Sequence, residues 1–165
     1  MGKKGIFLFV ALLLPGVIFV FLKLFGKNEF AVEPLFQKEK PAAMSGCGDI
    51  TLPYRVDAAV VKEILPERDS LVLIWFVKDA TASSAAATEM GQLKTELAGD
   101  PVGFVSIDRD DQRFTDWYDC RFLMRGPLDA VIVDKSGVIR GQYELEDRDE
   151  ADRLRTEVTI LLKKY

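Results

Sequence analysis

The chain has 165 residues, with 22 basic and 26 acidic side chains and no histidine. This length accommodates one domain and a short additional segment. All 26 acidic residues but only 18 of the basic ones follow Lys27, so that part carries a net charge of −8. Such an acidic balance argues against binding to nucleic acid and against adhesion to anionic lipid surfaces.

The first segment of the chain is apolar. No charged residue lies between Ile6 and Leu22, and the apolar character continues to Phe25. About 20 such residues suffice to cross a bilayer as a helix, and no small-residue cleavage site of a signal peptide follows. Residues 1–27 are therefore predicted to be a retained anchor in the inner (cytoplasmic) membrane. The lysines near the N-terminus favour a single pass with a cytoplasmic N-terminus and a periplasmic C-terminal domain.

Residues 28–48 are predicted to be a linker, because they combine prolines, glycines and scattered charge without a sustained period. The domain, residues 49–165, begins with a strand or extended segment from Ile50 to Arg55. Pro53 within it suits a sheet edge, since proline cannot donate to a ladder. Asp57 can then cap a short helix that ends at Pro66.

A buried strand follows from Leu71 to Val77, where every residue is apolar. The next helix begins near Ser83 or Ser84 and ends at Gly99. Then come a strand from Val102 to Ile107 and a helix that starts at the acidic run of residues 108–111.

The last third of the domain contains a hairpin and a helix. The strands are Ala130 to Val133 and Val138 to Tyr143, joined by the turn at residues 134–137. The final helix begins at Glu146 and Asp147, with acid at its start and base at its end. The order β-α-β-α-β-α-β-β-α predicts an α/β fold with a central mixed sheet and helices on both faces.

This order of elements resembles the thioredoxin-like fold. The resemblance implies a cis-proline just before the first strand of the hairpin, where Pro127 stands, although an ordinary trans proline remains open. It also implies two cysteines in the loop after the strand at residues 71–77. The loop contains none, and it is a degenerate active-site loop made of Lys78, Asp79, Ala80, Thr81, Ala82 and Ser83.

Within that superfamily the chain resembles the membrane-anchored Sco/SenC group. The resemblance rests on the anchor, the linker, the strand residues Ile74 to Val77 and the hairpin sequence from Val131 to Gly141. It implies copper binding by CxxxC and a histidine during cytochrome oxidase assembly. The cysteine positions fall near Asp79 and Ser83, and the histidine position falls between residues 125 and 128. None of these ligands is present, so no metal site and no cofactor are expected.

The two cysteines, Cys47 and Cys120, leave three readings open: one disulfide, two separate unreactive thiols, or a reactive or metal-binding pair. Neither is predicted at a helix N-terminus, which would lower the pKa of the thiol. Asp108, Asp110 and Asp111 are expected to serve as caps rather than as cation ligands, because a calcium loop needs more oxygen ligands.

Three functions remain open from the sequence. The first is a protein without enzymatic, redox or copper chemistry that acts as an accessory subunit or assembly factor of a respiratory oxidase or similar membrane complex. The second is copper or thiol handling for cytochrome c oxidase maturation through Cys47 and Cys120, with copper as cofactor. The third is a structural anchor domain in an unrelated envelope complex.

Overall fold

A computed structural model describes residues 13–21, 23, 31–39, 41, 46–78 and 85–163. The chain divides into two compact units, Met1–Ala31 and Val32–Tyr165. In the first unit residues 13–21 and 23 are helical, and the large apolar side chains of residues 13–21 are 46% to 67% exposed. No helix within the described ranges is long and apolar enough to cross a membrane. Half of the apolar span from Ile6 to Phe25 lies outside these ranges, so the predicted anchor stays untested.

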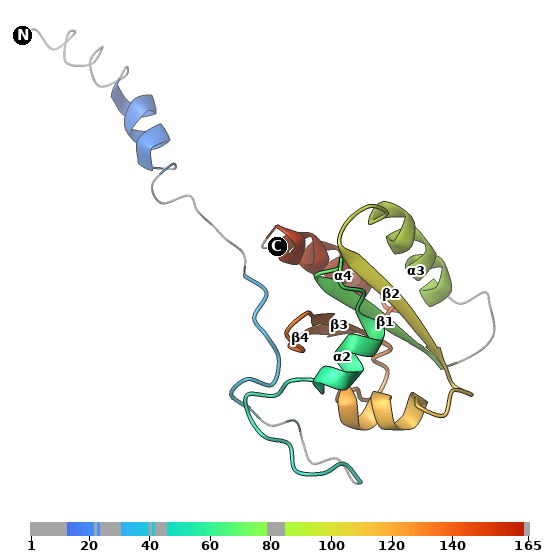
Figure 1. Ribbon diagram of the computed structural model, residues 1–165. Coiled ribbons are helices and arrows are strands. Elements are labelled where there is room, and N and C mark those ends of the chain that lie inside the picture. Colours follow the sequence, from blue (N-terminus) through green and yellow to red (C-terminus); the bar gives the residue numbers. More distant parts are fainter. Residues whose placement is uncertain are drawn as a thin grey trace, which may run out of the picture. The chain divides into compact units, whose positions relative to one another are not determined.

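The second unit is an α/β domain built on a mixed sheet of four strands (Figure 1). The strands lie in the order β2-β1-β3-β4, with β1 parallel to β2 and antiparallel to β3, and β3 antiparallel to β4. Their bounds are β1 Leu71–Val77, β2 Val102–Asp108, β3 Ala130–Asp134 and β4 Ile139–Tyr143. The helices are α2 Ala58–Ile64, α3 Ala85–Glu96 and α4 Arg148–Leu162, with a π-helix at Asp116–Arg121. This mixed α/β arrangement confirms the fold class predicted from the order of elements.

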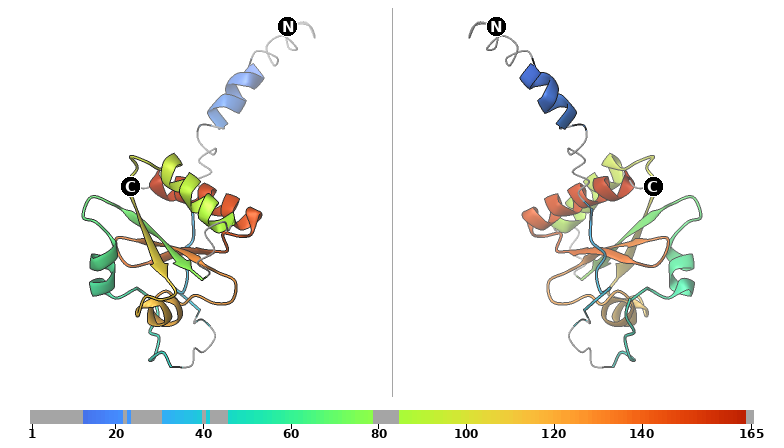
Figure 2. Two further views of the ribbon diagram at one scale, coloured as in Figure 1. Left: turned by 90° about the vertical axis from the view of Figure 1, so that its right-hand side faces the viewer. Right: turned by 90° about the vertical axis from the view of Figure 1, so that its left-hand side faces the viewer.

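Helices cover both faces of the sheet, with α3 and α4 on one side and α2 and the π-helix on the other (Figure 2). Alternate residues of β1 point to the two sides: Val72, Ile74 and Phe76 join the core under α2, and Leu71 and Leu73 join the core under α3. These five side chains are fully buried. The uninterrupted apolar sequence of β1 therefore follows from its position in the middle of a three-layer domain.

Two helices begin at the acidic residues that the sequence singled out. The side chain of Asp57 accepts a hydrogen bond from the backbone N–H of Ala59 at 2.8 Å, and Asp147 caps α4 in the same way through Asp149. The helix after β2 differs from the prediction. The carboxylate of Asp111 accepts from the N–H of Arg113 and forms a turn. Residues 112–113 form a turn, and the helix starts after it.

The lead-in segment from Ile50 to Arg55 is not a strand, contrary to one of the two predicted options. Backbone groups within it and just after it have other partners: the N–H of Tyr54 donates to the carbonyl of Phe36, and the N–H of Val56 donates to the carbonyl of Gly137. Gly137 has a φ of +78° and lies against the Val56 backbone, where a Cβ would come within 2.7 Å of the Val56 oxygen. The turn therefore requires glycine there.

Pro127 follows a trans peptide bond, one of the two isomers that the sequence left open. Among the described residues the cis peptide bond precedes Pro53. Gly126, with a φ of +57°, reverses the direction of the backbone in front of Pro127.

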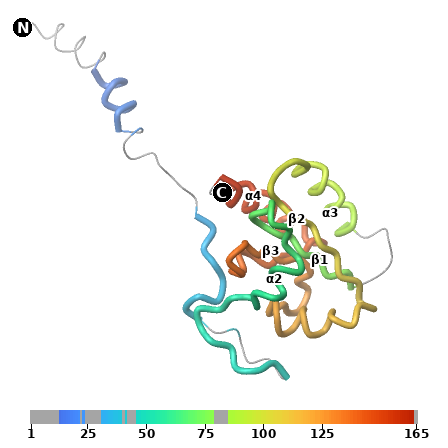
Figure 3. Tube along the Cα trace, viewed as in Figure 1, coloured from blue at the N-terminus to red at the C-terminus, as the bar shows by residue number. Residues whose placement is uncertain are grey.

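Residues 32–39, within the segment predicted as a linker, contribute to the domain. The N–H of Leu35 donates to the carbonyl of Ile139 on β4, which is the outer strand of the sheet. Val32, Leu35 and Phe36 pack against the two cores. The segment lies beside the terminal hairpin in Figure 3 and supplies a partner to an otherwise open strand edge.

Candidate functional site

The candidate site lies at the end of the sheet where β1 stops and β3 starts. Trp75 pairs with Ala130 across these antiparallel strands, so the loop after β1 meets the segment before β3. Lys78 is the described residue of the predicted loop. Asp79, Ala80, Thr81, Ala82 and Ser83 lie outside the described residues, so their placement stays untested.

Lys78 and Tyr118 hold the segment before β3 in place. The ammonium of Lys78 donates to the carbonyl of Gly126 at 2.7 Å and lies 5.0 Å from the centre of the Tyr118 ring. The hydroxyl of Tyr118 donates to the carbonyls of Gly126 and Leu128, at 3.1 and 2.8 Å. The turn that contains Pro127 is therefore held by hydrogen bonds to the residues on both sides of the proline.

A pocket of about 190 Å³ opens beside this turn. It is lined by Trp75, Lys78, Ala86, Pro127, Asp129, Glu144 and Glu146. These residues come from the end of β1 and the position after it, the first turn of α3, the segment before β3 and the segment after β4. The pocket thus lies where segments next to these elements meet at one end of the domain.

Asp129 is the most deeply buried acid of this pocket, with 7% of its surface exposed. Its backbone continues the sheet: its carbonyl accepts from the N–H of Phe76 and its own N–H donates to the carbonyl of Tyr143. One carboxylate oxygen accepts from the N–H of Leu145 at 2.8 Å. Within the described part of the chain this is the one hydrogen bond to the carboxylate, which makes no ion pair there.

The surroundings of Asp129 disfavour its charge. Burial raises the pKa of its carboxyl to about 6, opposed by the Leu145 hydrogen bond and the charge of Lys78, while Glu146 and Glu144 add to the rise. A carboxyl with a perturbed pKa in a pocket is a candidate functional group. At neutral pH the group is mostly ionised and lies among other negative charges.

The cysteines lie elsewhere. Cys47 and Cys120 form a disulfide with a Cα–Cα distance of 5.3 Å, within the usual range. It joins the segment before α2 to the π-helix, where the hydroxyl of Tyr54 also donates to the carbonyls of Cys120 and Arg121. Neither cysteine lines the pocket. Across the described residues, no group of three or more Cys, Asp or Glu side chains could hold a metal ion.

Sequence reasoning missed Asp129, Glu144 and Glu146. Two signals could have found them. Asp129 directly precedes a fully buried strand and follows Pro127 by two residues, and the two glutamates directly follow the strand that pairs with it. The ends of adjacent antiparallel strands meet, so these three acids had to lie at one edge.

A larger hollow of about 540 Å³ lies between α2 and the turn of the hairpin. Its lining mixes basic and acidic side chains, and one of them, Arg55, already donates to the carbonyl of Ser136. It lies at the other end of β3 from the predicted loop. The smaller pocket is therefore the better candidate. It lies at the predicted loop, and it contains a buried acid, Asp129, whose carboxylate accepts one backbone hydrogen bond within the described residues.

The chain matches no family of proteins and no curated protein. The function is therefore argued from its own residues.

Proposed function

We propose that this chain is a membrane-anchored protein with a thioredoxin-like, Sco-like domain that performs no redox or copper chemistry. It acts by binding a partner, as an accessory subunit or assembly factor of a membrane complex such as a respiratory oxidase. The fold part of this proposal is supported by the strand order β2-β1-β3-β4 and by the helices on both faces. The domain also ends in the expected antiparallel hairpin and helix.

The observation that carries the functional part is the position of the two thiols. Copper or disulfide chemistry in this fold would use the loop after β1, but Cys47 and Cys120 are bonded to each other at the π-helix. The pocket beside the loop has carboxylates and an ammonium instead. These groups suit recognition, because they offer charge and hydrogen bonds and neither soft ligands for Cu(I) nor thiols for exchange.

The anchor is supported by the apolar sequence before Lys27 and by the exposed helical residues of the first unit. Among residues 13–21, Phe19 is 67% exposed and Phe21 is 58% exposed. Contiguous apolar surface of this kind marks an interaction with membrane or protein. An anchor confines the domain to the membrane surface, where a membrane-bound partner is met.

Purification of the full chain from native membranes in mild detergent tests the proposal. We expect one stoichiometric partner complex on a native gel. A matched chain in which residues 1–31 are replaced by an unrelated membrane anchor should keep the partner, since the pocket lies in the second unit. Migration of the wild-type protein alone would contradict the proposal, and the identity of the partner separates a respiratory complex from another envelope complex.

The copper alternative predicts a different result. Titration with Cu(I), with thiols counted before and after reduction, should show no tight one-to-one binding by the oxidised protein. Tight binding that disappears in the Cys47→Ser variant would favour copper handling instead.

A further inference from the structure

We propose that the pocket lined by Trp75, Asp129 and Glu144 receives one basic side chain, an arginine or a lysine, from the partner protein. This inference rests on the proposed function for the source of that side chain. The preference of the pocket for an organic cation can be measured without the partner.

The charge of the pocket is unbalanced. Three of its lining residues, Asp129, Glu144 and Glu146, are acidic, and one, Lys78, is basic. Within the described residues none of the three acids takes part in an ion pair. The attraction for a cation is strengthened by burial, since Asp129 is only 7% exposed.

The internal lysine does not satisfy these acids. Its ammonium is directed to the carbonyl of Gly126 at 2.7 Å and to the ring of Tyr118. The carboxylate of Asp129 accepts one backbone hydrogen bond, from Leu145. A carboxylate has two oxygens and accepts about four hydrogen bonds, so capacity remains for a donor that comes from outside.

The shape of the pocket favours a side chain over a metal ion. The three acids do not form a group that could hold a metal ion. A space of about 190 Å³ is large for a single ion but accommodates a guanidinium or ammonium on its carbon stem. Trp75, half-buried in the wall, supplies an aromatic surface of the kind on which such cations lie.

The experiment uses the full chain in detergent micelles and follows the indole resonance of Trp75 and the amide resonance of Leu145 by NMR. The probe is N-acetyl-arginine amide, and the matched control is N-acetyl-citrulline amide, which has the same shape without the charge. We expect saturable shifts with arginine, at millimolar concentrations, and at least about fivefold weaker binding of citrulline.

The Asp129→Asn variant should weaken arginine binding about fivefold to tenfold. The control is Asp69→Asn: Asp69 is also 7% exposed but lies at the other end of β1 and does not line the pocket. It should bind like the wild type. If Asp129→Asn does not fold, Glu144→Gln tests the same pocket and should weaken binding about twofold.

Binding should also weaken as the pH falls from 7 to 5, because the pKa of Asp129 is raised to about 6 and its protonation removes one of the charges that line the pocket beside Glu144, Glu146 and Lys78. Equal binding of arginine and citrulline, or equal effects of Asp129→Asn and Asp69→Asn, would overturn the inference. Tighter binding of Ca²⁺ than of the arginine probe at the same resonances would also overturn it.

The two proposals fail in different ways. If a partner complex is found but the arginine probe does not bind, the proposed function is supported and this inference is contradicted. If the arginine probe binds but no partner complex is found in native membranes, the proposed function is contradicted and the cation pocket is supported.

Discussion

The two ends of β3 carry two buried acids with opposite environments. Asp134 stands at the carboxyl end, in the turn of the hairpin, and Asp129 stands just before the amino end. Both are almost inaccessible to solvent, with 0% and 7% of their surfaces exposed. The comparison separates an acid that organises the fold from one that is available to a ligand.

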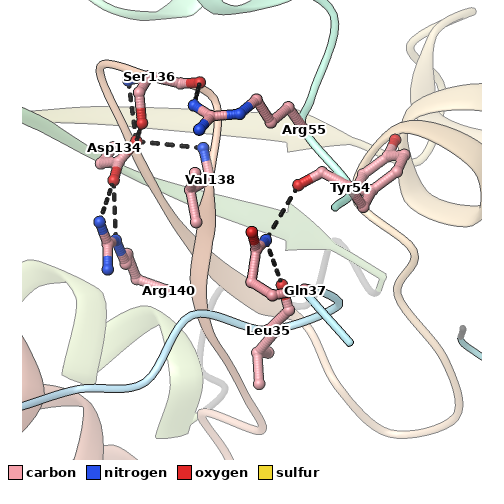
Figure 4. A network of polar contacts seen from close by, with 8 residues as sticks. All are labelled: Leu35, Gln37, Tyr54, Arg55, Asp134, Ser136, Val138 and Arg140. Atoms are coloured by element: carbon pink, nitrogen blue, oxygen red, sulfur yellow. Dashed lines mark hydrogen bonds and ion pairs between the residues drawn. The ribbon is translucent and has the colours of Figure 1, made fainter. Parts of the chain in front are cut away.

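The carboxylate of Asp134 is surrounded by donors. It accepts from the N–H and hydroxyl of Ser136, from the N–H of Val138 and from the guanidinium of Arg140 (Figure 4). Burial alone would raise the pKa of Asp134, but these hydrogen bonds outweigh burial and lower it. Asp129 has a single backbone donor and two acidic neighbours, so its pKa is raised to about 6. The two acids are buried to nearly the same extent, so their opposite pKa shifts come from the groups that surround each carboxylate.

The largest effect should come from removing the charge of Asp134. The Asp134→Asn variant leaves the guanidinium of Arg140, whose side chain is only 11% exposed, without its anion. We expect the free energy of unfolding to fall by about 3 kcal/mol, as for other broken buried pairs. Urea unfolding at pH 7 measures the loss.

A double-mutant cycle with Arg140→Gln sharpens this prediction. The double variant should lose less than the sum of the two single losses, because the two groups share one interaction. Additive losses would show that Asp134 does not depend on Arg140. The contribution of Asp134 to stability should also depend on pH. Because folding lowers the pKa of Asp134, its charge stabilises the folded protein above the ordinary carboxyl pKa. This stabilisation is lost as the pH falls through the pKa of the folded state.

Removal of the disulfide should have an effect of similar size. Cys47 and Cys120 are separated by 73 residues in the chain, and the Cys47→Ser/Cys120→Ser variant should lose about 2–4 kcal/mol through the greater freedom of the unfolded chain. The arginine probe should still bind the pocket of the folded variant, because neither cysteine lines it. Loss of probe binding by a folded variant would link the two regions.

The smallest effect has the opposite sign. The Asp129→Asn variant should be more stable than the wild type by about 1–2 kcal/mol at pH 7, because the buried charge is gone and an amide oxygen can still accept from Leu145. The raised pKa means that the wild type loses stability as the pH rises from about 4 to about 6 and little beyond. Thermal unfolding of both proteins at pH 4, 5, 6 and 7 should show the gap opening in that window. A destabilised variant at pH 7 would place Asp129 with Asp134 as a structural acid.

Most elements of the fold could be predicted because local chemistry decides them. The apolar run of β1, the caps Asp57 and Asp147 and the turn glycine at 137 each specify their structure nearly alone. The failures involve competition between distant groups. The lead-in segment forms hydrogen bonds with Phe36 and with the hairpin turn, so its own sequence could not show that it lies outside the sheet.

The candidate site was predictable in place but not in chemistry. The order of elements placed the site in the loop after β1, and the absence of cysteines from that loop argued against redox activity. The acids of the pocket come from the segment just before β3 and from the segment after β4, more than 50 residues further along the chain than Lys78. Their one-letter sequence resembles ordinary helix caps and solvated charge, and only their meeting at one strand end distinguishes them.

Photo-cross-linking in native membranes tests most directly whether a partner binds at this pocket. A benzophenone side chain in place of Ala85, which is exposed next to the pocket residue Ala86, should form a covalent product with one partner protein. The same group in place of Lys62, exposed on α2 at the other end of β3, is the control and should form none. A single product from position 85 alone is the result we predict. No product from position 85, or the same product from both positions, would contradict the account.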